Sequence, residues 1–186
     1  RKGWEAVTSS PLASTPAIEQ LFEYINSSGT STIISAAASK LYSGTTTLTE
    51  ITGSLTITDD NWKFANINGN MVGFQDSHAP IWWDGSGNAE TLQAQISDWA
   101  ASTAYAVGDL VKATGGAHGT LYFHCTTAGT SGGSEPTWDS TPGNTTTDNT
   151  ATWTTRTFPV GDTVLAAFGR IWTTDSTKTV LQYSDL

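Results

Sequence analysis

Charged residues are scarce in this chain of 186 residues, because only 13% of them are Asp, Glu, Lys or Arg, about half the usual share. Only 8 are Lys or Arg, against 17 Asp and Glu, which gives a formal net charge of −9. Binding to a nucleic-acid backbone needs clustered basic side chains, so this balance argues against specific nucleic-acid recognition. It says little about the fold, because net charge governs solubility rather than architecture.

Cysteine is nearly absent as well. The single Cys125 excludes a disulfide within the chain and a zinc site built from several cysteines. No apolar run reaches about 18 residues, which argues against a membrane-spanning helix. The opening Arg1-Lys2-Gly3-Trp4 is followed by no apolar stretch, so we expect no secretory signal peptide and expect the chain to be part of something longer.

The residues that replace charge are Thr, Ser, Gly and Asn. Thr favours strands through its branched β-carbon, whereas Gly and Asn favour turns. The 8 Trp and 5 Tyr residues supply bulk for a core. The composition therefore predicts an all-β protein with many short strands.

Two segments that start 100 residues apart, 64–84 and 164–184, carry the same apolar pattern. In each, a glycine (Gly69 or Gly169) is followed two positions later by an apolar pair and twelve positions later by a run containing an aromatic residue. A stretch of different character lies between them. Subtracting its roughly sixty residues leaves a period of about 40, the length of one four-stranded propeller blade.

We expect four parts. Residues 1–17 form an N-terminal arm or linker, 18–94 the first two blades of a partial β-propeller, and 95–155 an inserted β-module. Residues 156–186 form the start of the next blade, which stops before its fourth strand. Two or three blades cannot close a ring, so the remaining blades either lie outside this chain, which we favour, or come from other copies. The expected strands in the first two blades are 21–25, 31–35, 40–42, 48–51, 62–67, 71–74, 81–83 and 90–92, with a short helix over 16–25 as the alternative for the first.

The sequence predicts no metal site, no cofactor, no catalytic residue and no enzyme. The three histidines, His78, His118 and His124, lack metal-ligand spacing. The aspartates lack the spaced ligands of a calcium loop, and no nucleophile elbow is present. Glycoside hydrolysis needs two carboxylates held close together. The carboxylates considered for it, Glu50, Asp84, Glu90 and Glu135, all fall at expected turns or strand ends.

The tryptophans either fill a core or present a stacking surface. We expect Trp99 and Tyr105 in a core, and Trp138, which follows a Gly-rich loop, to be the best candidate for exposure. Trp82 and Trp83 are neighbours on a strand and point to opposite faces. Both faces of that strand must therefore be covered, as in stacked sheets. Cys125 is expected to be a small apolar strand residue.

The inserted stretch carries recognisable residues. The pattern Trp99…Tyr105-x-Val-Gly-Asp109-x-Val111…Tyr122-x-x-Cys125 resembles the small β-modules of chitinase-type carbohydrate-binding domains. Its ending, from Ala128 to Trp153, is similar to modules of bacteriophage tail and virion proteins. Exposed aromatic residues form the sugar platform in the carbohydrate-binding family. The resemblance therefore implies Trp138, Trp153 and Tyr122 as glycan-binding residues.

The flanking repeats carry a second resemblance. The run Phe168-Gly-Arg-Ile-Trp172…Val180-Leu-Gln-Tyr-Ser-Asp185 resembles the blade motif of phage tail hub and nozzle proteins. This implies a structural component of a virion tail, an extracellular particle, with other copies in a ring and neighbouring tail proteins as partners. The inserted module would then contact host surface polysaccharide. The alternatives are an extracellular carbohydrate-binding protein without a virion role and, third, a glycan-active propeller enzyme.

Overall fold

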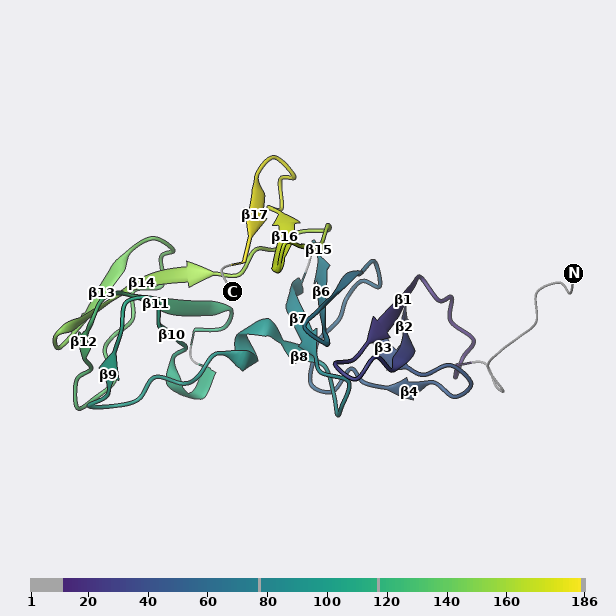
Figure 1. Ribbon diagram of the computed structural model, residues 1–186, viewed down its shortest axis with the longest axis horizontal. Helices are drawn as coiled ribbons and strands as arrows, with labels where there is room; N and C mark the ends of the chain where they lie inside the picture. The colour runs from purple at the N-terminus through teal and green to yellow at the C-terminus, as the bar shows by residue number, and fades with distance from the viewer. Residues whose placement is uncertain (1–11, 77, 117, 185–186) are drawn as a thin grey trace, which may run out of the picture. The chain divides into compact units, whose positions relative to one another are not determined.

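The computed structural model describes residues 12–76, 78–116 and 118–184 (Figure 1). The chain forms two compact units. The first contains the residues up to Thr91 and those from Pro159 onward, and the second runs from Leu92 to Phe158. Most of the expected N-terminal arm, residues 1–11, lies outside the described residues.

The protein is all-β, as its composition predicts. The described helical segments are two short 3-10 turns, η1 (Leu92–Gln95) and η2 (Thr114–Gly116), and no helix among the described residues is long and apolar enough to cross a membrane. The alternative of a helix over 16–25 is wrong, because a strand begins at Gln20. The strands of the first unit are β1 (Gln20–Ile25), β2 (Ser31–Ala37), β3 (Lys40–Ser43), β4 (Thr49–Glu50), β5 (Lys63–Ile67), β6 (Asn70–Gln75), β7 (His78–Trp83), β8 (Glu90–Thr91), β15 (Leu165–Ala167), β16 (Arg170–Thr174) and β17 (Leu181–Tyr183).

These strands form three antiparallel meanders in chain order, β1-β2-β3-β4, β5-β6-β7-β8 and β15-β16-β17, called sheet 1, sheet 2 and sheet 3 below. The repeat seen in the sequence is the first hairpin of sheets 2 and 3. Asn68 and Gly69 have φ of 50° and 77°, and Phe168 and Gly169 have 55° and 72°. Positive φ at both central residues makes a type I′ turn, which suits the twist of a two-residue hairpin.

Apolar clusters lie between the consecutive sheets. Tyr24, Ile34 and Leu41 of sheet 1 pack against Met71 and Trp83 of sheet 2. Burying an aliphatic side chain such as Ile34 or Leu41 stabilises the fold by about 1.5–3 kcal/mol. An exposed ion pair contributes about 0–1 kcal/mol. The stack is therefore held mainly by apolar burial.

The other face of sheet 2 packs against sheet 3. Val72 and Phe74 lie in a cluster with Ile171, and Trp82 packs against it. Trp83, in contrast, belongs to the cluster shared with sheet 1. This confirms that the Trp82-Trp83 strand is covered on both faces. The described residues of the three sheets close neither a ring nor a barrel.

The second unit has its own four-stranded sheet and core. The sheet has the order β10 (Leu110–Val111), β11 (Leu121–Thr127), β14 (Ala151–Thr157) and β13 (Thr145–Asp148), and β9 (Ala104–Tyr105) pairs with β12 (Gly129–Thr130). Trp99 and Cys125 are buried in the core and Tyr105 packs against it, as the sequence predicts.

Both ends of this unit touch the start of β11. The Gln93 side chain donates to the carbonyl of Leu121. At the other end, the ring of Phe158 packs on Tyr122 at 4.7 Å between centroids. The chain therefore enters and leaves the unit at neighbouring points.

Candidate functional site

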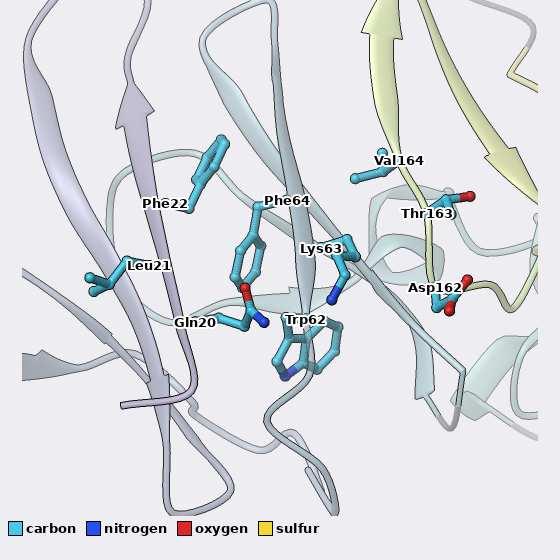
Figure 2. A pocket seen from close by; sticks show the side chains of 9 residues that line it. All are labelled: Gln20, Leu21, Phe22, Trp62, Lys63, Phe64, Asp162, Thr163 and Val164. Carbon is cyan, nitrogen blue, oxygen red and sulfur yellow. The ribbon is translucent and has the colours of Figure 1, made fainter. Parts of the chain in front are cut away.

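The starts of β1 and β5 and the segment just before β15 line one open hollow of about 370 Å³ (Figure 2). Strand β5 contacts both β1 and β15, so residues far apart in the sequence meet here. Phe22 and Phe64 lie side by side, 5.5 Å apart between ring centroids, whereas Leu21 points away on the other side of β1. The lining residues are Gln20, Leu21, Phe22, Trp62, Lys63, Phe64, Asp162, Thr163 and Val164.

The charged side chains that line the hollow form hydrogen bonds with other side chains of the protein. Lys63 donates to the Asn61 side-chain carbonyl, which also accepts a long 3.5 Å bond from Gln20. Asp162 accepts a hydrogen bond from Lys178, and this bond holds the pKa of Asp162 below its ordinary value and raises the pKa of Lys178. Asp162 is the only carboxylate among the lining residues. The hollow therefore lacks the pair of carboxylates that glycoside hydrolysis requires.

Candidate metal and acid–base residues are dispersed. In the described part of the chain, no three His, Cys, Asp or Glu side chains gather to hold a metal ion. His78 lies against Trp62, His118 lies against Phe123, and His124 is on β11. Glu50 forms an ion pair with Lys40 at 2.6 Å, and Asp84 accepts a hydrogen bond from the Ser86 backbone N–H within its own turn. Glu90 lies on β8, and Glu135 accepts a hydrogen bond from the Thr114 backbone N–H in the second unit.

The two tryptophans expected to bind glycan lie in the core of the second unit. Trp153 is fully buried and Trp138 is 5% exposed. Trp138 stacks on Phe123 at 3.8 Å between ring centroids and meets Trp153 edge-on at 5.9 Å. Trp138, the best candidate for exposure from the sequence, is therefore a core residue. Because stacking on a sugar requires an open ring face, neither ring forms a platform in this arrangement.

A buried carboxylate organises that aromatic core. Asp148, 3% exposed at the end of β13, accepts hydrogen bonds from the indole nitrogens of Trp99 and Trp153 at 2.8 and 3.2 Å. Its second oxygen accepts a 2.7 Å bond from the backbone N–H of Gly132. One side chain thus joins three separate segments of the unit. Hydrogen bonds to a charged acceptor contribute about 1.5–3 kcal/mol each.

Glu135 holds Trp138 in a similar way. Its carboxylate accepts a 2.7 Å bond from the Trp138 indole and a 3.0 Å bond from the Thr114 backbone N–H, and it also bonds the Thr114 hydroxyl. Partial burial raises the pKa of Glu135, but the bonds from Thr114 and Trp138 outweigh it, so the pKa lies below its ordinary value. The Glu135 loop therefore pins Trp138 inward instead of presenting it.

Tyr122 is the one expected glycan contact that is not buried in the core. It is half-buried on β11 and pairs across the sheet with exposed Arg156. The neighbouring row brings His124 opposite Leu110 of β10, which is 43% exposed. Alternation along the strands places Phe123 and Cys125 on the core side, so these residues share the opposite side of the sheet. We call Leu110, Tyr122, His124, Arg156 and Phe158 the outer face of the second unit.

Sequence reasoning missed two features. The first is Asp148, which ends a run of three threonines that contains no apolar residue to mark an inward face. The second is the exposure of Leu165, Leu181 and Tyr183 on sheet 3. The repeat with sheet 2 marks these positions as apolar, because Ala65, Ile81 and Trp83 stand 100 residues earlier, but those residues are buried and give no sign of exposure in sheet 3.

Comparison with models of known protein families, with curated proteins and with solved structures finds no match for the chain.

Proposed function

We propose that the three stacked sheets are consecutive β-propeller blades and that the chain is a structural component of a bacteriophage tail, of the nozzle or hub type. The observation that carries the proposal is the order of the stack. Sheet 2 packs one face on sheet 1 and the other on sheet 3, and its first strand β5 contacts the first strands β1 and β15 of both neighbours. Blades of a propeller pack in this order around their axis.

The chemistry of the chain is compatible with a scaffold. The hollow between the first strands carries one carboxylate, which is already bound by Lys178. The apolar contacts between sheets are extensive, and few charges need hydration. The blade-like run from Phe168 to Asp185 supplies the assignment to a tail protein, and other copies together with neighbouring tail proteins would be its partners.

The test is to locate the chain in particles. Purified phage particles would be analysed by mass spectrometry, and an antibody against the second unit would be used to label them for electron microscopy. We expect peptides of this chain in intact particles and label at the tail. Absence of the chain from particles that carry every other structural protein would reject the virion role and leave the alternative of a free extracellular binding protein.

A second candidate function is glycan contact by the outer face of the second unit. The observation that favours it is the Tyr122–Phe158 ring pair beside Arg156, since an aromatic ring with nearby polar groups is suited to a sugar. In this proposal, the glycan contacts the sheet surface and not Trp138 or Trp153. Host surface polysaccharide is the proposed ligand.

Titration of the whole chain against chitin oligosaccharides and bacterial surface polysaccharides tests this candidate. We expect Tyr122→Ala to weaken binding at least tenfold, the effect of losing about 1.4 kcal/mol. The matched control is Val107→Ala, another exposed apolar position in the same unit. Equal binding by both variants, with both folded by circular dichroism, would reject the outer face as the binding surface.

A further inference from the structure

One face of sheet 3 is apolar and is covered by none of the described residues. The paired residues Leu165, Trp172 and Tyr183 form a row across its three strands. Leu165, Leu181 and Tyr183 are 60%, 65% and 57% exposed. An open hollow of about 350 Å³ lies along this side, lined mostly by apolar side chains that include Ala167. We call these five residues the sheet 3 face. Exposed apolar surface of this kind marks an interaction site.

Sheet 2 shows what covers such a face. Its paired row Ala65, Val72 and Trp82 is equivalent to Leu165, Trp172 and Tyr183, because the first hairpins of both sheets have the same register. In sheet 2 this row is covered, since Ala65 and Val72 are buried against Ile171 and other residues of sheet 3. The partner of the covered row is thus the opposite face of the next sheet in the stack.

The other end of the stack presents such an opposite face. On sheet 1, Phe22 and Tyr24 pack toward sheet 2, so the alternating residues Leu21, Glu23 and Ile25 lie on the side away from it. Leu21 is 66% and Ile25 is 41% exposed. We call Leu21, Glu23 and Ile25 the sheet 1 face. It occupies the same side of its sheet as Ala166 and Ile171 in sheet 3, which pack on sheet 2.

The two faces also differ in charge. Arg170 pairs with Ala167 on the sheet 3 face, and its guanidinium lies 4.7 Å from the centre of the Tyr183 ring. The sheet 1 face carries Glu23, which is exposed. Opposite charges at two apolar faces favour one register and disfavour contact of each face with itself.

We propose that a second copy of this chain packs its sheet 1 face on the sheet 3 face of the first, so that copies join head to tail and continue the stack across the boundary between chains. A head-to-tail joint is not self-complementary, so it produces rings if the rotation closes and open assemblies if it does not. This inference rests on the blade-like stack of the proposed function, but it makes a separate claim about association in solution.

The test is the mass of the whole chain in solution, measured by light scattering and by native mass spectrometry across a concentration series. We expect species larger than a monomer for the unmodified chain. Leu165→Asp and Leu21→Asp are each expected to give monomers, because each buries a charge at one side of the joint. Both positions are exposed, so neither change should unfold the chain, and circular dichroism checks this. The control is Val107→Asp, at an exposed site of the second unit, which should leave association unchanged.

Mixing the two variants gives the decisive result. Leu165→Asp retains an intact sheet 1 face and Leu21→Asp an intact sheet 3 face. Together they should form a capped dimer, although each alone is a monomer. Assembly that Leu21→Asp leaves intact, or a mixture that stays monomeric, would overturn the head-to-tail joint. An unmodified chain that is monomeric at its highest soluble concentration would also overturn the joint and would indicate that something other than a second copy covers the sheet 3 face. That outcome would not affect the particle-labelling test of the proposed function.

Discussion

Replacing Asp148 should destabilise the second unit more than any other change of a single carboxylate. In Asp148→Ala, the indole N–H groups of Trp99 and Trp153 and the backbone N–H of Gly132 all lose their acceptor. A buried donor without a partner costs about 1–3 kcal/mol, so three of them give at least about 3 kcal/mol. This is a large share of the total stability of about 5–15 kcal/mol that is typical of a domain.

Asp148→Asn separates charge and hydrogen-bonding capacity from size. The single amide oxygen can accept either from Gly132 or from the two indoles, and the NH₂ group then faces the remaining donor or donors. Donors that face each other form no bond, so at least one of the three interactions is lost whichever way the amide turns. We expect a loss of at least about 1 kcal/mol, smaller than that of Asp148→Ala, by the same reasoning. The control is Asp98→Ala in the same unit, whose side chain is 57% exposed and lies 3.8 Å from Lys112. It should cost no more than about 1 kcal/mol.

Hydrogen exchange of the β11 and β14 amides in the whole chain, followed by mass spectrometry, reads the opening of this unit separately from the first. Because about 1.4 kcal/mol corresponds to a factor of ten, a loss of 3 kcal/mol should speed exchange about a hundredfold in Asp148→Ala. If exchange in Asp148→Ala is no faster than in Asp98→Ala, the carboxylate does not hold the core together and the reasoning fails.

Three further predictions concern other parts of the fold. Gly69→Ala should destabilise the first unit more than Gly169→Ala, as measured by urea unfolding. Both glycines have positive φ, which costs an alanine about 1–2 kcal/mol. Only a Cβ at Gly69 would also clash, because it would lie 2.5 Å from the Ser27 backbone nitrogen. Equal losses would show that the close approach to Ser27 relaxes freely. Because the folded pKa of Glu135 lies below its ordinary value, its contribution to stability is complete above a pH of about 4.3 and is lost as the pH falls toward the folded pKa. Glu135→Gln should therefore make the melting temperature fall less steeply on the acid side of its pH profile. An unchanged acid slope would count against this role of the carboxylate. Burial raises the pKa of the Cys125 thiol, so a thiol reagent should label it only as fast as the unit opens, and labelling at the rate of a free thiol would contradict its placement.

The sequence predicts the hairpins of the first unit well, because their signals are local. Alternating apolar residues and the turn at Asn68-Gly69 determine strand and register together, and the Trp82-Trp83 pair already requires a cover on each face. The expected strand over 90–92 is cut short, since Leu92 begins a 3-10 turn.

The candidate site was less predictable, because its contacts join distant segments. Trp138 follows a Gly-rich loop that suggests exposure, but it stacks on Phe123, fifteen positions earlier in the chain. The carboxylate of Glu135 then ties its indole inward. No local sequence pattern predicts that the chain folds back to bring these side chains into contact. The buried role of Asp148 is hidden for the same reason, since its three donors come from three separate segments.

The neighbouring ends of the second unit have a consequence for folding. Gln93 and Phe158 both contact the start of β11, so the unit closes its own ends once its core has formed. For the first unit, the connection from β8 to β15 then acts as a short link, although the two strands are far apart in the sequence. Loop-closure entropy depends on the length of free chain. Folding of the second unit first would therefore shorten the search by which sheet 3 finds sheet 2.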